Sequence, residues 1–222
     1  SVPAHCEYCA PVFKRLRGHP SIVEVALMLN EETQVPDEAL PVAELKDHLR
    51  LGSGFAEDDL QDSLLSSFLR AAMAAIEGWT DKALISREFR LTLQDWKTPE
   101  RQPFPIAPVL SVESVHFADA EGSITSPLTG WRLIKDMTEP LLVAVARPFA
   151  GIPSTGSVEI QFVGGYGPSF DDVPADLRQA VLLLAAHYYE YRDETALSEG
   201  CMPFGVTALL SRYRKIRMGM GA

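Results

Sequence analysis

The stretch VPADLRQAVLLLAAHYYEYRDE, Val173–Glu194, decides how this chain of 222 residues folds. Pro174 suits the first turn of a helix, where the backbone N–H that proline lacks would have no partner in any case. From Val181 to Tyr189 the helix is apolar on nearly every side, so it should be buried on several sides. It is too apolar for the free surface of a monomer and predicts an obligate interface. We expect core contacts or contacts between subunits from four of its residues: Leu177, Val181, Leu184 and Tyr188.

Three further helices are indicated, two before this stretch and one after it. The first covers 42–51, opened by Pro41 and ended by glycines at 52 and 54. The second covers 57–79, where apolar residues recur every three or four positions and acidic residues occupy the first turn. The last follows Pro203 and covers 206–217.

The middle of the chain changes to the period of β-strands. Phe89, Leu91 and Leu93 alternate with polar residues, as in a strand with one buried face. Further strands fit 111–117, 131–134, 141–146 and 157–163, and the proline-rich stretch 99–108 reads as a loop. The sequence therefore predicts an α+β fold: a helix pair, an inserted small antiparallel β-sheet and a second helix pair.

This order divides the chain into regions. We expect an N-terminal tail and connector over 1–40 that is partly extended, with 22–29 either a strand or a short helix. The helical core should take 41–86 and 173–217, and the inserted β-sheet 87–168. A flexible end is expected over 218–222.

Composition and charge exclude several classes of protein. Hydrophobic residues make up 46% and charged residues 23%, as in soluble globular proteins, and no apolar run approaches the roughly 20 residues that cross a membrane. We expect no membrane partner and, without an apolar signal segment near the N-terminus, folding in the cytoplasm. The formal net charge of −10 argues against wrapping nucleic acid. Acidic residues concentrate between Glu31 and Asp62, whereas the chain after Glu199 is basic.

The sequence contains few residues in a pattern that indicates catalysis, metal binding or phosphate binding. Cys6 and Cys9 beside His5 have a metal-like or thiol-like spacing, but a closed zinc site needs four ligands and the pair lies in the N-terminal tail. Gly164–Gly167 lacks the order of a phosphate-binding loop and predicts a turn that needs the positive φ of glycine. His187 and His48 read as packed core residues. We expect no catalytic site, no metal and no cofactor; an enzyme using the cysteine pair is the alternative.

The basic residues near the C-terminus, 212–217, are the stronger indication of function. Arg212, Tyr213, Arg214, Lys215, Ile216 and Arg217 place four cations among an aromatic and an aliphatic residue, more than helix capping requires. This pattern favours a docking element for an acidic partner. A nucleic-acid-binding module is a third hypothesis for the same segment.

Several segments, in this order and spacing, resemble phage head–tail connector (adaptor) proteins, including the adaptors of gene transfer agents, which are phage-like particles. The resemblance covers 41–217 and is loose in the strand region. Its anchors are Pro41–Arg50, Trp79–Leu84, Val163–Gly167, Val173–Ala180, Ala186–Glu190 and Pro203–Leu210 with Tyr213 and Arg214.

The resemblance implies a ring-forming structural subunit. Twelve copies would assemble under the portal protein after DNA packaging, with the basic residues 212–217 on the portal and a further neck or tail protein on the other face. Packaged DNA would pass through the ring without specific binding, and the protein would end in the neck of the particle. The sequence separates neither phage from gene transfer agent nor a free ring from a free monomer.

Overall fold

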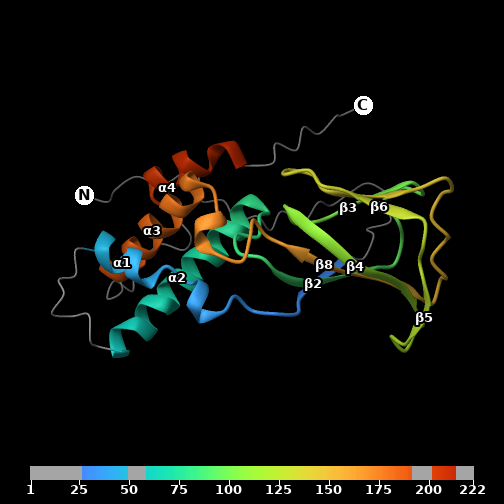
Figure 1. Ribbon diagram of the computed structural model, residues 1–222, viewed down its shortest axis with the longest axis horizontal. Helices are drawn as coiled ribbons and strands as arrows, with labels where there is room; N and C mark the ends of the chain where they lie inside the picture. Colours follow the sequence, from blue (N-terminus) through green and yellow to red (C-terminus); the bar gives the residue numbers. More distant parts are fainter. Residues whose placement is uncertain (1–26, 50–58, 192–201, 214–222) are drawn as a thin grey trace, which may run out of the picture.

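The computed structural model describes residues 27–49, 59–191 and 202–213. Its helices gather at one end of an elongated body and its strands at the other (Figure 1). The order of elements confirms the expected α+β architecture, with a helix pair on each side of the main strand region. No helix in the described part of the chain is long and apolar enough to span a membrane.

Four α-helices form the helical end. They are α1 (Val42–His48), α2 (Asp59–Thr80), α3 (Ala175–Glu190) and α4 (Phe204–Leu210). Within the described ranges, three single-turn 3₁₀ helices accompany them: η1 (Asp37–Ala39), η3 (Phe170–Asp172) and η4 (Ser211–Tyr213). The last helix was expected to run unbroken over 206–217. Instead, α4 ends at Leu210 and tightens into η4, and residues 214–217 lie outside the described ranges.

The strands form two antiparallel sheets where one was expected. The first sheet has the order β1-β2-β8-β4-β5 and the second β3-β7-β6. Their bounds are β1 (Leu27–Glu31), β2 (Arg87–Leu93), β3 (Arg101–Pro103), β4 (Val109–Ala118), β5 (Ile124–Pro127), β6 (Trp131–Ile134), β7 (Leu141–Ala144) and β8 (Ser157–Gly164). The chain before the first helix pair therefore supplies the edge strand β1, and the expected loop 99–108 contains β3.

The predicted alternation is clear in the two central strands. Phe89, Leu91 and Leu93 of β2 are buried and face the core together with Val158, Ile160 and Phe162 of β8. Phe162 lies against Phe89 and Phe104, with ring centroids 5.6 Å and 4.9 Å apart. Burial of these aromatic rings gives the sheet end a core of its own.

A second core fills the helical end, and α3 runs through it. Leu177, Val181 and Leu184 are 0–1% exposed, packed against residues of α1, α2 and α4. The apolar character of α3 is therefore largely satisfied inside the subunit, which confirms core contacts for these three residues. A contact of α3 with a neighbouring subunit stays a prediction. Three of the four proposed contact residues have no surface to offer, and only Tyr188 is half-buried.

The turn at the end of β8 holds the two ends of the molecule together. Gly165 has φ +134°, which confirms the expected glycine turn. A Cβ at this position would lie 2.4 Å from the Cα of Ser86, so the backbones touch. The amide of Gly165 donates to Pro108 O and that of Tyr166 to Leu84 O, at 3.0 and 3.1 Å. These amides are used within the fold and do not form a phosphate site.

Candidate partner-binding surfaces

The end of the described chain is tied to the start of α3 by Asp176. The Tyr213 hydroxyl donates to Asp176 Oδ1 at 2.7 Å, and Arg212 Nε lies 3.0 Å from Asp176 Oδ2. Arg212 Nη2 also donates to the Tyr213 hydroxyl at 2.9 Å. We call these three residues the C-terminal anchor. Its charges are favourably placed, because a carboxylate in the first turn of a helix is stabilised by the helix dipole.

The pKa values of two tyrosines, Tyr213 in the anchor and Tyr166 near it, are raised. Burial raises the pKa of Tyr213 to about 12, assisted by its hydrogen bond to Asp176 and by the charge of that carboxylate. Burial, followed by the charge of Asp176, also raises the pKa of Tyr166. Both phenols therefore stay protonated at neutral pH, so Tyr213 keeps the O–H that it donates to Asp176.

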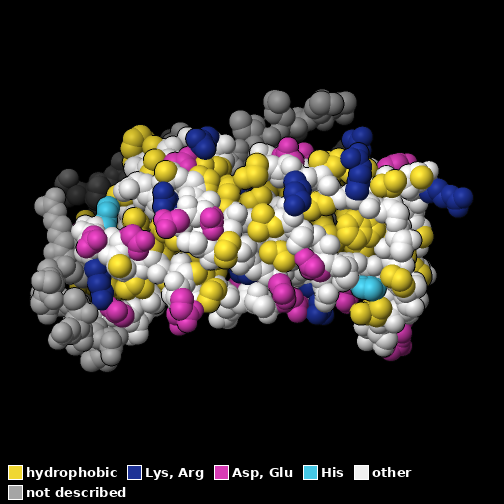
Figure 2. Space-filling view, viewed as in Figure 1, with side chains coloured by type: hydrophobic (Ala, Val, Ile, Leu, Met, Phe, Trp, Pro, Cys, Tyr) yellow, Lys and Arg dark blue, Asp and Glu magenta, His cyan; other side chains and the backbone are white. Residues whose placement is uncertain are grey.

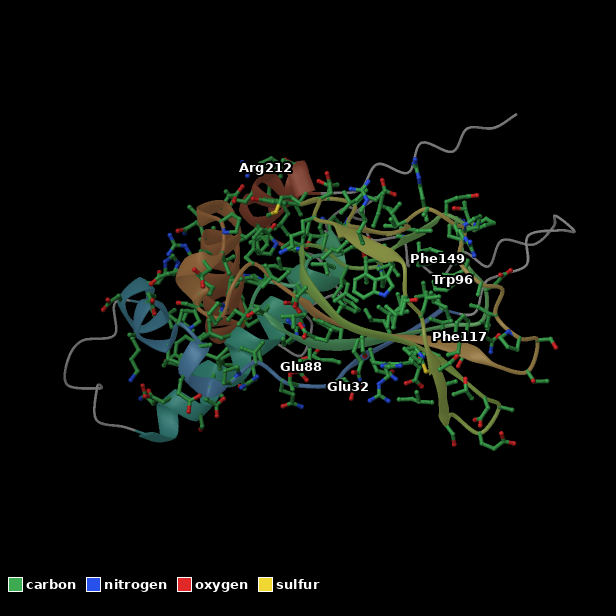
Figure 3. All side chains as sticks on the ribbon, turned by 45° about the vertical axis from the view of Figure 1, so that its right-hand side comes forward. Glu32, Glu88, Trp96, Phe117, Phe149 and Arg212 are labelled. Atoms are coloured by element: carbon green, nitrogen blue, oxygen red, sulfur yellow. The ribbon has the colours of Figure 1, made fainter. Side chains whose placement is uncertain are left out.

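The structure describes only the first two residues of the predicted docking segment 212–217. Arg212 and Tyr213 lie in the anchor, and the Arg212 side chain remains 69% exposed although it is paired with Asp176. Arg212 lies on the opposite side of the body from Glu32 and Glu88 (Figure 3). Arg214, Lys215, Ile216 and Arg217 lie outside the described ranges.

A groove of about 260 Å³ lies between α1, α3 and α4 and contains both histidines singled out in the sequence. His48 is exposed and His187 half-buried, so the interpretation of both as packed core residues is wrong. Phe204, at the start of α4, is 88% exposed beside the groove. The lining of this helical groove is His48, Leu183, Ala186, His187, Glu190, Pro203, Gly205 and Val206.

A second groove, of about 420 Å³, lies at the sheet end. Phe149 in its wall stacks on Trp96 with ring centroids 4.4 Å apart, and Trp96 Nε1 donates to Ala150 O at 2.9 Å (Figure 3). Ala146 on its rim has φ +68°, unusual for a residue with a side chain. The lining of this sheet groove is Phe117, Pro127, Leu128, Thr129, Gly130, Val145, Ala146, Arg147, Pro148, Phe149 and Ala150.

Apolar and charged side chains are both spread over the described surface. On the face drawn in Figure 2, apolar side chains gather over the middle and the sheet end, and acidic side chains lie over both ends. Within the described ranges, no three His, Cys, Asp or Glu side chains gather as a metal ion would require. His5, Cys6 and Cys9, the basis of the enzyme alternative, lie outside those ranges.

Arg87 joins the helical end to the sheet end. Its guanidinium donates to both carboxylate oxygens of Glu77 on α2, at 3.1 and 2.8 Å, and to Glu31 of β1 at 3.2 Å. Burial alone would lower the pKa of Arg87, but the hydrogen bonds and charges of Glu77 and Glu31 together outweigh burial and raise it. Glu77 also accepts a hydrogen bond from Leu84 N at 2.7 Å, so one carboxylate holds the junction from two sides.

Three similar proteins of known structure are chains of gene transfer agent particles. No family profile and no curated protein matches the chain. Among solved structures, a chain in the neck of an empty gene transfer agent particle, computed with C6 symmetry, is 52% identical with a TM-score of 0.79. A chain of the virion of a native gene transfer agent particle is 52% identical with a TM-score of 0.77.

A third similar chain belongs to the neck of a native particle computed with C12 symmetry, with 49% identity and a TM-score of 0.75. In all three cases the match covers 87% of this chain and 98% of the other. Identity at this level over nearly the whole of each relative establishes common ancestry as well as a common fold. The chain therefore belongs to the phage-type head–tail connector family, in the group that includes the neck proteins of gene transfer agents.

Proposed function

We propose that the protein is the head–tail adaptor of a gene transfer agent or a related phage. Twelve copies form a ring under the portal protein, join the DNA-filled head to the next neck or tail protein, and line the passage for DNA. The observation that carries this proposal is the match to neck chains over 98% of their length. The C6 and C12 symmetry of those necks supports a ring.

A ring places constraints on the surface of each subunit. Cyclic assembly brings copies together head to tail, so two different surfaces of one subunit must be complementary. The buried residues Leu177, Val181 and Leu184 support the subunit core, and Tyr188 remains the candidate of that set for a contact between subunits. The two grooves at opposite ends of the body offer further surface for such contacts.

The portal contact is assigned to residues 212–217. Their four cations stand against the net charge of −10 of the whole chain and would steer an acidic portal surface toward this end. Because Arg212 is engaged by Asp176, the direct contact falls mainly on Arg214, Lys215 and Arg217.

Deletion of residues 214–222 tests the portal contact and leaves the C-terminal anchor in place. The shortened protein should remain soluble and folded but fail to co-sediment with DNA-filled heads that expose the portal. Deletion of only 218–222, which keeps all four cations, is the matched control and should bind as the full chain does. Undiminished binding by the 214–222 deletion would contradict the assignment.

A further inference from the structure

Asp176 contacts residues that are far from it in the sequence. Tyr213, which donates to Oδ1 at 2.7 Å, is 37 positions later in the chain. Oδ2 lies 3.0 Å from Arg212 Nε, so each carboxylate oxygen has its own partner. The Asp176 side chain is only 18% exposed, whereas that of Arg212 is 69% exposed.

The elements that carry these partners cannot hold their own position. The α4 helix has seven residues and η4 has three, and helices this short are unstable without tertiary contacts. Val206 and Leu210 anchor α4 in the helical core. No residue of η4 is fully buried. Tyr213 packs in part against the helical core, and the polar contacts of Arg212 and Tyr213 with Asp176 complete the attachment of η4.

We propose that Asp176 is a positioning residue for partner binding: through Arg212 and Tyr213 it fixes the point at which the basic segment leaves the body. This inference rests on the proposed portal contact of residues 214–217. A binding segment whose attachment point is fixed binds more tightly, because less conformational freedom is lost on binding. The anchor thus gives the basic segment of every copy in a ring the same point of departure from the body.

The substitution Asp176→Asn separates positioning from simple charge attraction. It removes a negative charge close to the basic segment, so a segment acting by charge alone would bind an acidic portal as well as before or better. If Asp176 positions the segment, loss of the ion pair with Arg212 weakens binding. We expect affinity for DNA-filled heads, measured by quantitative co-sedimentation, to fall roughly tenfold, the equivalent of about 1.4 kcal/mol.

Asp171→Asn is the matched control. Asp171 pairs with Arg178 at 2.7 Å near the same end of α3, and its replacement changes the net charge by the same amount. Its side chain is 81% exposed and it has no contact with the anchor, so head binding should be unchanged. Asp176→Asn that binds heads as tightly as the unaltered protein, or more tightly, would overturn the inference.

Two further measurements keep the result interpretable. Hydrogen exchange of the η4 amides should be faster in Asp176→Asn, with exchange in the buried part of α3 unchanged. If that variant fails to fold, Tyr213→Phe is the alternative: it removes both hydrogen bonds of the Tyr213 hydroxyl, to Asp176 and from Arg212, and keeps the ion pair. It should weaken head binding severalfold, and unchanged binding would reject the inference. A different result would show that residues 214–217 do not contact the portal: the protein lacking residues 214–222 would then still bind heads.

Discussion

At the scale of single residues, Gly165 is the position least able to accept a side chain. Its φ of +134° is strained for any other residue, and an added Cβ would meet the backbone of Ser86 at 2.4 Å. We expect Gly165→Ala to lower the free energy of unfolding by about 3 kcal/mol, at the upper end of the strain of a single residue. Chemical denaturation measures it directly.

Gly78 provides the control for that substitution. It lies in α2, and an added Cβ would meet no atom within 4 Å. Gly78→Ala should raise the free energy of unfolding by about 1 kcal/mol, because alanine favours the helix. If both substitutions lowered the free energy of unfolding by the same amount, Gly165 would not be specially constrained.

Tyr213 gives the anchor a dependence on pH. Its pKa rises from the ordinary value of 10.0 for a tyrosine to about 12 in the folded protein, so folding favours the protonated phenol. The resulting stabilisation is complete below pH 10 and is lost as the pH rises through about 12. The difference in melting temperature between the unaltered protein and Tyr213→Phe should stay constant up to about pH 10 and shrink above it. A difference that grows with pH would contradict this sign.

At the scale of elements, the junction of α2, β1 and β2 depends on Arg87. Its side chain is 7% exposed, and its removal would leave Glu77, 16% exposed, without its charged partner. Arg87→Met should therefore cost about 3 kcal/mol. It should also separate the unfolding of the helices, followed by far-ultraviolet circular dichroism, from that of the sheets, followed by the fluorescence of Trp96 and Trp131 in a Trp79→Phe background, because Trp79 lies in α2.

Arg178→Met is the corresponding control at the surface. Arg178 is 36% exposed and its partner Asp171 is 81% exposed, so loss of this pair should cost less than about 1 kcal/mol. The junction would not depend on the buried pair if Arg87→Met lowered the free energy of unfolding as little as Arg178→Met does. In that case the helices and the sheets of Arg87→Met would also unfold together.

The elements differ in how far the sequence predicts them. The long helices and the strands β2 and β8 follow from hydrophobic periodicity, because each repeats its pattern several times. The strands β3 and β5 have three and four residues, too few to establish a period. In β1 only Leu29 is not exposed, so no alternation marks it. Its place in the sheet comes from pairing with β2, residues far away in the chain.

The same limit applies to the candidate site. The basic composition of 212–217 is visible in the sequence and predicts a docking segment. The role of Asp176 is not visible, because a single carboxylate in the first turn of a helix is ordinary and its partners come 36 and 37 residues later. Likewise, an apolar α3 fits a core within one subunit or a contact between subunits. Only the packing of α1, α2 and α4 around it decides for the core.

At the scale of the whole molecule, the charge distribution bears on DNA. Each subunit has a net charge of −10, and its cations after Glu199 are confined to residues 212–217. We expect negligible binding of duplex DNA by the purified protein, with no steep dependence on salt, as suits a channel that DNA slides through. Electrophoretic mobility shifts over a range of salt concentrations test this. Tight binding that falls steeply with salt would favour the nucleic-acid-binding hypothesis.

The proposed neck ring under the portal can be observed by electron microscopy of DNA-filled heads purified without the protein and then mixed with it. We expect a ring of twelve subunits stacked on the portal, with the C-terminal segment of each subunit on the portal side. Heads whose portals stay bare at saturating protein, or protein bound elsewhere on the particle, would contradict it.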